Sequence, residues 1–228
     1  LGVEIPPEEI PLAQKLIIQK CNDKGIPVIT ATQMLDSMIR NPQATRAEIT
    51  DVANAIFDGT DAVMLSGETA VGKYPIKAVE LMDKIALKME ESFDHVARLE
   101  VRRKNRRQSI ADAISLATCQ TAYDLNVRAI LCITQSGATA RSIAKYRPEA
   151  PIIAACPQQS VVNRLMLAWG VNPILAGSPN KTEYLINSAV KAVKELGLAN
   201  TGELVAITAG VRTGIPGSTD LLLVSEIE

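Results

Sequence analysis

The 228 residues carry 24 basic and 25 acidic side chains and are 47% hydrophobic, which is enough for a sizeable core in one large domain or two ordinary ones. The balanced charge gives no reason to expect a nucleic-acid or membrane-surface partner, and no apolar run reaches the roughly 18 residues of a membrane-spanning helix. The four cysteines, Cys21, Cys119, Cys132 and Cys156, show no CxxC spacing, which favours free, mostly buried thiols in a reducing cytosol.

The first 95 residues predict helices and strands in alternation. Apolar spacing and turn residues place these elements at 6–25, 26–32, 45–59, 61–68 and 74–93. The helix at 45–59 begins with a capping box, Thr45 with Glu48, and closes at Gly59. Both strands are near-continuous apolar runs, which is typical of parallel α/β proteins. Two strands are too few to close a sheet, so we expect this part to belong to a larger domain in a longer protein.

A basic stretch follows and predicts a boundary. Residues 96–107 are poor in apolar side chains and form our predicted linker between two domains. Its basic residues are Arg98, Arg102, Arg103, Lys104, Arg106 and Arg107. A polyanion-binding arm is the alternative, which we favour less because no aromatic residues accompany the charges.

Residues 108–228 predict a second, complete domain. Ser109 with Asp112 gives a further capping-box pattern, opening a helix that runs to about Leu125. Strands are expected at 128–134, 151–156, 171–176, 203–208 and 220–227, with helices at 138–146, 160–170 and 180–197, the last capped by Asn180. This pattern predicts a three-layer α/β/α domain.

Polar residues occur where the two strands of the first part end. Thr32 and Gln33 stand where one strand ends, and Ser66 and Glu68 come after the apolar run Ala62 to Leu65 of the other, with Gly67 easing a tight turn between them. Ligands of parallel α/β folds bind at the carboxyl ends of strands, so these side chains are candidates for a site. Local helix capping is the alternative for each of them.

Longer segments carry a family resemblance. The stretches "LGVEIP", "ITATQMLDSM", "NPQATRAEITDVANAIFDGTDAVMLSGETA" and "KYRPEAPIIA" resemble the pyruvate kinase family in order and spacing, through essentially the whole chain. The resemblance implies that residues 1–95 are the later part of a (β/α)8 TIM barrel and that 108–228 are the family's C-terminal allosteric domain. It also implies a cytoplasmic, homotetrameric glycolytic enzyme that transfers a phosphoryl group from phosphoenolpyruvate to ADP, giving pyruvate and ATP.

The resemblance gives the residues at the strand ends their roles. Thr32 matches a threonine that faces the substrate near the carbon that is protonated when enolpyruvate becomes pyruvate. A threonine hydroxyl both donates and accepts, so it suits binding and proton relay. Gln33 matches a substrate-binding neighbour, while Ser66 and Glu68 match catalytic residues that organise the relaying waters. Arg46 matches an arginine at a subunit contact, and pairing with Glu48 or Glu4 is the alternative.

Several functional segments of the family match no residue of this chain. They include the Arg-Gly-Asp stretch and the Lys-Ile-Glu segment with the metal carboxylates and the phosphoryl-stabilising lysine, the nucleotide and potassium sites, and the lid domain. We therefore assign no ligand for Mg²⁺, Mn²⁺ or K⁺ here. Because phosphoryl transfer depends on positioned cations, we expect the 228 residues alone to be inactive.

The second domain carries its own candidate site. The strand at 128–134 ends in hydroxyls and a glycine before a helix begins, an arrangement that presents N–H groups to a phosphate. The effector phosphate-binding residues implied here are Thr134, Ser136, Gly137, Ala138, Thr139 and Arg212. In the family this loop binds the phosphate of activating sugar phosphates or nucleotides. Some members have a lysine for fructose 1,6-bisphosphate where this chain has the neutral Gln135, so a monophosphate is favoured.

Two alternatives remain open from the sequence. The loop at 134–139 is also compatible with a plain helix cap. The whole chain is also compatible with a stand-alone, non-catalytic module that binds phosphorylated metabolites. An open reading frame continuing upstream through Arg-Gly-Asp would favour the enzyme.

Overall fold

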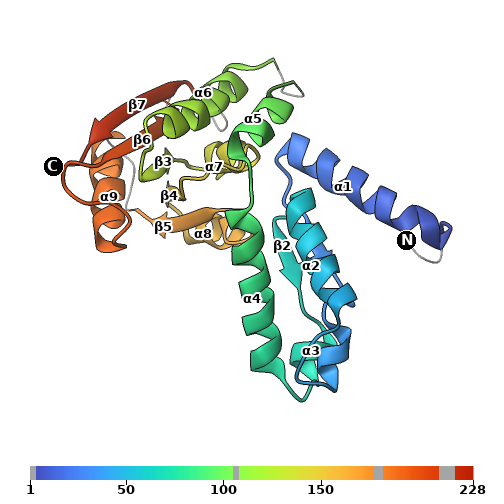
Figure 1. Ribbon diagram of the computed structural model, residues 1–228. Coiled ribbons are helices and arrows are strands. Elements are labelled where there is room, and N and C mark those ends of the chain that lie inside the picture. The colour runs from blue at the N-terminus through green and yellow to red at the C-terminus, as the bar shows by residue number, and fades with distance from the viewer. Residues whose placement is uncertain (1–3, 105–107, 177–181, 211–218, 228) are drawn as a thin grey trace. The chain divides into compact units, whose positions relative to one another are not determined.

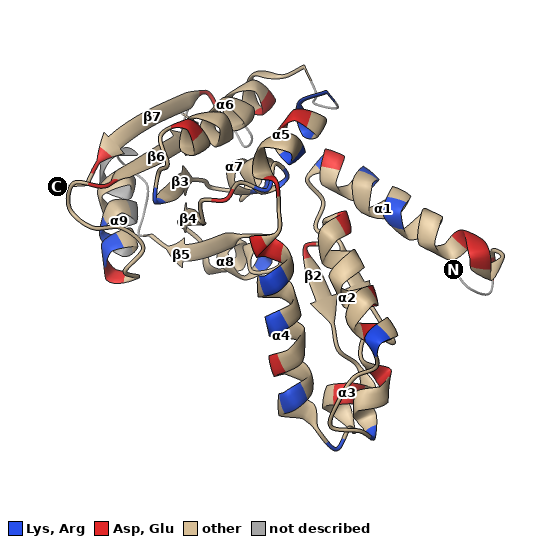
Figure 2. Cartoon of the chain, in the orientation of Figure 1, with Lys and Arg blue, Asp and Glu red and all other residues tan. Residues whose placement is uncertain are grey.

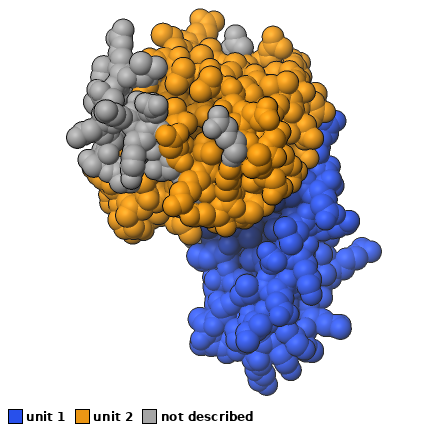
Figure 3. Space-filling view, turned by 90° about the vertical axis from the view of Figure 1, so that its left-hand side faces the viewer, with its two compact units in different colours: residues 1–94 blue, residues 95–228 orange. Residues whose placement is uncertain are grey.

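The chain forms two compact units, which are treated separately. The computed structural model describes residues 4–104, 108–176, 182–210 and 219–227. Unit 1 is Leu1–Asp94 and unit 2 is His95–Glu228 (Figures 1 and 3). The division therefore falls next to the predicted end of the first part at residue 95.

Unit 1 has the alternating helices and strands that the sequence predicts. Its helices are α1 (Ile10–Lys24), α2 (Arg46–Asp58), α3 (Gly67–Ala70) and α4 (Pro75–Glu91), with 3-10 turns η1 (Pro7–Glu9) and η2 (Asp36–Ile39). Its strands, β1 (Ile29–Ala31) and β2 (Ala62–Met64), pair in parallel with Ala31 opposite Met64. The predicted capping box of Thr45 and Glu48 is confirmed at the start of α2, and Gly59 ends that helix in a left-handed conformation.

The core of unit 1 extends into the segment after β1. Met34, Leu35 and Met38 are buried in one apolar cluster with residues of α2 and α4. The remaining buried members of this cluster are Val52, Ile56, Ala78, Met82, Ile85 and Phe93. Because Leu35 is fully buried, the chain just before it is anchored, and that chain contains Thr32 and Gln33.

Our prediction that residues 96–107 form a linker is wrong for most of this stretch, which is helical. Most of it is helix α5 (His95–Lys104), which belongs to unit 2 and buries Leu99 in that unit's core (Figure 1). Arginine, lysine, leucine and glutamate are good helix formers, and the basic residues of the last turn suit the negative end of the helix dipole (Figure 2). The buried Leu99 and a contact of 3.1 Å between Nδ1 of His95 and the carbonyl oxygen of Arg147 hold this helix, and a charge count reveals neither. Residues 105–107 lie outside the described residues.

Unit 2 is built on a five-stranded sheet in the order β5-β4-β3-β6-β7. The strands are β3 (Ala129–Ile133), β4 (Ile152–Cys156), β5 (Val171–Leu175), β6 (Leu204–Ala209) and β7 (Leu221–Glu226). The helices besides α5 are α6 (Ile110–Asp124), α7 (Ala138–Ala144), α8 (Gln159–Leu165) and α9 (Thr182–Glu195). All neighbouring strands are parallel except β7, which runs antiparallel to β6. The five predicted strands are confirmed, and Asn180, the predicted cap of α9, lies outside the described residues.

The sheet of unit 2 is covered on both faces. Ile130 and Cys132 of β3 belong to an apolar cluster with α6, α7 and α8, whereas Ala129 and Leu131 belong to a cluster with α9. Successive residues of a strand point to opposite faces, so β3 is apolar throughout because both faces are buried. Figure 2 shows no charged residue on β3 or β4. The predicted three-layer domain is thus confirmed. No described helix is both long and apolar enough to cross a bilayer.

Truncating Leu99 tests whether α5 belongs to the core of unit 2. Leu99→Ala should lower the free energy of unfolding by about 2–5 kcal/mol, because Leu99 is 7% exposed. Val101→Ala on the same helix, where Val101 is 61% exposed, should stay within about 0.5 kcal/mol. Urea unfolding followed by the fluorescence of Trp169, the single tryptophan and a residue of unit 2, measures both. Equal effects of the two substitutions would show that α5 is not anchored in this core.

Candidate functional site

The residues after β1 adopt an unusual backbone conformation. Thr32 has a φ of 72° and Gln33 a φ of 57°, and both side chains are exposed. This left-handed region is rare for residues other than glycine, and rarest for β-branched residues such as threonine. Such conformations persist where the surrounding structure fixes them, and they cluster at functional sites. The strained pair is the pair that the sequence predicts to bind substrate.

Glu68 connects this segment to the end of β2. Its Oε1 accepts a hydrogen bond from the N–H of Leu35 at 3.0 Å, and its Oε2 accepts one from the N–H of Ser66 at 2.7 Å. The side chain is buried, with Glu68 only 2% exposed. One carboxylate therefore joins the segments that follow both strands, and it places Thr32 and Gln33 at the same edge as Ser66.

The ionisation of Glu68 follows from these contacts. Burial of the carboxylate raises its pKa, and the negative charge of Glu48 adds a smaller effect in the same direction. The backbone N–H groups of Glu68 itself, Leu35 and Ser66 lower the pKa, and together they outweigh the burial, so that the net pKa is below its ordinary value. Glu68 is therefore ionised at neutral pH with its oxygens bound to backbone N–H groups. Its direct contact is with the backbone, and its predicted role in organising water stays a prediction.

Side-chain capping does not account for Thr32 and Ser66 at this edge, whereas Glu68 accepts the N–H of Ser66, the N-cap of its own helix. The N-cap of η2 is Leu35 and that of α3 is Ser66, and neither makes a side-chain capping hydrogen bond. The hydroxyl of Thr32 makes no hydrogen bond to the described residues. The hydroxyls of Thr32 and Ser66 are thus not used as helix caps.

Gly67 serves packing rather than a left-handed turn. We expected it to ease a tight turn, but it is not among the glycines with a positive φ. A Cβ at Gly67 would instead lie 2.8 Å from Cδ1 of Ile39 in η2. The absent side chain therefore allows α3 to approach η2 closely, which brings Ser66 and Glu68 beside the segment after β1.

A second carboxylate, that of Glu48, supports η2 through a contact that the sequence did not reveal. Glu48 accepts hydrogen bonds from the N–H and the hydroxyl of Ser37, both at 2.6 Å, in addition to its capping contacts with Thr45. Burial raises the pKa of Glu48, but these hydrogen bonds lower it by more. The sequence predicted only the capping box, because Ser37 lies outside the helix that Glu48 caps. Since its carboxylate binds Ser37 and Thr45, Glu48 does not act as the partner that we considered for Arg46.

The described residues do not fit a metal site. Across the described part of the chain, no group of three or more His, Cys, Asp or Glu side chains is placed to hold a metal ion. The buried carboxylate at the strand edge, Glu68, already binds backbone N–H groups with both oxygens. We therefore assign no ligand for Mg²⁺ or K⁺ to these residues.

In the loop after β3 of unit 2, one of the predicted phosphate donors is already used within the loop. The hydroxyl of Thr134 accepts the N–H of Gly137 at 3.0 Å, and Gly137 has a φ of 81°. Thr134 and Thr139 are each 5% exposed, whereas Gln135 is exposed and Ser136 is half-buried. Of the predicted effector residues, Ser136 and Ala138 thus retain accessible surface, while Thr134, Gly137 and Thr139 are buried.

The segment before β7 meets this loop. The hydroxyls of Thr139 and Thr219 lie 2.8 Å apart, although 80 residues separate them in the sequence. The loop after β3 and the segment before β7 are therefore joined at this point. Arg212, the predicted cation of that site, lies outside the described residues.

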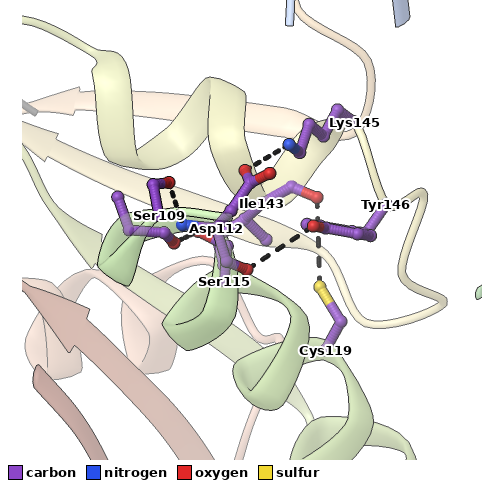
Figure 4. A network of polar contacts seen from close by, with 8 residues as sticks. Ser109, Asp112, Ser115, Cys119, Ile143, Lys145 and Tyr146 are labelled. Carbon is purple, nitrogen blue, oxygen red and sulfur yellow. Dashed lines mark hydrogen bonds and ion pairs between the residues drawn. The ribbon is translucent and has the colours of Figure 1, made fainter. Parts of the chain in front are cut away.

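A buried ion pair fixes the other end of α7 (Figure 4). Lys145, just after the helix, pairs with Asp112 of α6, and their side chains are 11% and 7% exposed. The N–H of Asp112 donates to the hydroxyl of Ser109 at 3.2 Å, which confirms the predicted cap. The ammonium of Lys145 also lies 4.9 Å from the centre of the Tyr146 ring. Because breaking such a buried pair is costly, α7 is held firmly against α6.

Comparison with known proteins identifies relatives along the whole chain. A family model described as "Pyruvate kinase, barrel domain" matches residues 1–79, and one described as "Pyruvate kinase, alpha/beta domain" matches residues 112–225. The pyruvate kinase of Clostridium acetobutylicum is 51% identical over 228 residues, and that of Geobacillus stearothermophilus is 55% identical over 227 residues. A crystal structure of a pyruvate kinase from Cryptosporidium parvum matches with a TM-score of 0.93 at 40% identity.

The relatives are considerably longer than this chain. All of the chain is covered in these three comparisons, but it spans 48% of the Clostridium protein, 39% of the Geobacillus protein and 45% of the Cryptosporidium chain. The matched models confirm the expected fold, with part of a pyruvate kinase barrel followed by the family's α/β domain.

Replacing Glu68 by glutamine tests the carboxylate bridge. An amide offers one acceptor and one donor to two N–H groups, so Glu68→Gln should lower the free energy of unfolding at pH 7 by about 1–3 kcal/mol. The folded pKa of Glu68 is lowered, so its stabilisation is present above the ordinary glutamate pKa of about 4.3 and is lost as the pH falls through the folded pKa. The difference from wild type should therefore shrink below about pH 4.

Urea unfolding between pH 3 and 7 measures this difference. Glu80→Gln, at an exposed position of α4, is the matched control and should match wild type throughout. A Glu68→Gln variant as stable as wild type at pH 7 would contradict the bridge.

Proposed function

Because the chain belongs to the pyruvate kinase family, we propose that unit 1 supplies part of the active site of a pyruvate kinase. The reaction transfers a phosphoryl group from phosphoenolpyruvate to ADP, giving pyruvate and ATP. The observation that carries the proposal is the Glu68 bridge, which brings Thr32 and Gln33 to the same strand edge as Ser66. The carboxyl ends of parallel strands are where such barrels bind their substrates.

Thr32 is the residue that we assign to proton transfer. Once the phosphoryl group has left, the methylene carbon of enolpyruvate must gain a proton to become the methyl group of pyruvate. The exposed hydroxyl of Thr32 gives that proton and takes another from water, since a hydroxyl both donates and accepts. Its backbone conformation directs the side chain differently from a continuing strand.

The neighbouring residues bind and orient the reactants. The exposed amide of Gln33 binds the substrate carboxylate, and the hydroxyl of Ser66 orients the water that reprotonates Thr32. Glu68 acts on this water only through the backbone of Ser66, and it fixes the approach of Thr32 through Leu35. These roles follow from the matching family positions and from the contacts of this chain.

The family uses Mg²⁺ or Mn²⁺ together with K⁺, which supply positive charge to the phosphoryl group during transfer. The described residues hold no group of three or more His, Cys, Asp or Glu side chains placed to bind a metal ion, so no step is assigned to these ions here. We expect the 228 residues alone to give no pyruvate from phosphoenolpyruvate and ADP, and we expect the whole enzyme to act as a cytoplasmic homotetramer.

We assign an effector site to unit 2. The loop Thr134–Thr139 binds the phosphate of a sugar phosphate or a nucleoside monophosphate and thereby activates the enzyme. Two observations support this assignment: Ser136 keeps accessible surface, and a buried contact between Thr139 and Thr219 joins the loop to the segment before β7. A stand-alone metabolite-binding module is not favoured, because residues 1–79 match the barrel domain of the family.

Removing the hydroxyl of Thr32 tests the proposed chemistry. The test uses a chimera in which this chain is exchanged for the corresponding part of the Geobacillus stearothermophilus enzyme, to which it is 55% identical. In an active chimera of this kind, Thr32→Val should lower kcat by about 10²–10⁴-fold, with a smaller effect on the affinity for phosphoenolpyruvate. A coupled lactate dehydrogenase assay measures both quantities.

Thr50→Val is the matched control for this experiment. Thr50 is an exposed residue of α2 whose hydroxyl donates to the carbonyl of Arg46, so its loss should leave kcat unchanged. If Thr32→Val kept kcat within about twofold of the parent chimera, Thr32 would have no part in the proton transfer.

A further inference from the structure

Arg141 lies next to the proposed effector loop, and most of its guanidinium N–H groups donate to no described residue. Its Nη1 donates to the carbonyl oxygen of Ser136 at 3.4 Å, which is the long end of the hydrogen-bond range. Among the described residues this is the one hydrogen bond of its side chain, out of the five N–H donors that a guanidinium carries. A Cβ at Gly137 would lie 2.9 Å from the same nitrogen, so the glycine lets the guanidinium lie directly against the loop.

A second arginine, Arg164, lies on α8, where its Nε donates to the carbonyl oxygen of Ser160 at 3.3 Å. A Cβ at Gly137 would also lie 3.0 Å from Leu165, the residue after Arg164, so the end of α8 lies beside the loop. The pKa of Arg141 is lowered, first because the side chain is partly buried and then because of the positive charge of Arg164. Neither arginine takes part in an ion pair with a described carboxylate.

We propose that Arg141 binds the phosphate dianion of the effector and selects for it, with Arg164 adding positive charge nearby. Arg141 presents its guanidinium edge beside Ser136, while Arg164 adds a second positive charge from the surface of α8. This inference rests on the proposed effector site, and it supplies the positive charge that the neutral Gln135 does not.

The charges favour a phosphate monoester over a carboxylate. Arg141 and Arg164 repel one another and pair with no described carboxylate, so an anion bound at Arg141 relieves the repulsion. A phosphate dianion matches the two positive charges, whereas a single carboxylate leaves one of them unbalanced. A guanidinium also offers two parallel donors that fit two phosphate oxygens. Uncharged sugars and nucleosides should therefore not bind here.

Calorimetric titration of the 228-residue chain tests the proposal. The probes are AMP and ribose 5-phosphate, with adenosine, ribose and acetate as the comparison compounds. Arg141→Gln should weaken binding of the phosphate compounds by about tenfold or more, the usual effect of losing a charged hydrogen bond. Arg141→Lys keeps the charge without the paired donors and should lose less. Arg164→Gln should also lose less, and should reduce the salt dependence of binding.

Controls distinguish the role of Arg141 from the existence of the effector site. Arg103→Gln, at an exposed position of α5, should bind as wild type does, and thermal unfolding of each variant shows that it is folded. If wild type binds the phosphate compounds and folded Arg141→Gln binds them equally well, the role of Arg141 is contradicted and the effector site stands. If wild type binds neither phosphate compound, both are contradicted. Equal binding of acetate would contradict the selectivity for phosphate.

Discussion

The hydrogen bonds of one buried carboxylate, Glu68, hold the candidate catalytic edge together. The two strands of unit 1 are three residues long each, and so short a pair has little stability of its own. By accepting the N–H groups of Leu35 and Ser66, Glu68 fixes both chain segments that leave the strands. The left-handed backbone at Thr32 and Gln33 persists because the chain is held immediately after it, through this bond and the buried side chain of Leu35. Burial of the charge is unfavourable, and the three N–H contacts offset it.

Unit 2 also relies on buried polar contacts, which here fix the two ends of α7. Its sheet is apolar on both faces, so polar chemistry is confined to the loops at strand ends and to helix termini. The ion pair of Lys145 and Asp112 secures one end of α7, and the contact of Thr139 with Thr219 secures the other. Between these fixed points Arg141 is only lightly bound, which leaves its guanidinium available to a ligand.

Local signals in the sequence predicted much of the fold. Apolar runs located the strands, and hydroxyl residues followed by acids located the starts of α2 and α6. The convergence of Thr32 and Ser66 was predictable because parallel strands end at the same edge. The family resemblance added the expected roles of these residues, which spacing alone did not give.

Contacts between residues distant in the sequence were not predictable in this way. Glu68 looked like a residue of the pocket, but its partner Leu35 is 33 positions away and is recognised only through its backbone. Nothing in the side chains of Thr32 and Gln33 indicates a positive φ, because the surrounding contacts impose it. The many charges of α5 concealed it in the sequence, because its anchors are the buried side chain of Leu99 and the contact of His95 with the carbonyl oxygen of Arg147.

Nuclear magnetic resonance of the wild-type chain tests the central claim most directly. The amide proton shifts of Leu35 and Ser66 should titrate together with the Glu68 carboxyl carbon, because all three report the same hydrogen-bonded carboxylate. The account predicts one shared midpoint below the ordinary glutamate pKa of about 4.3. Amide shifts that do not follow the Glu68 titration, or a midpoint above that value, would contradict it.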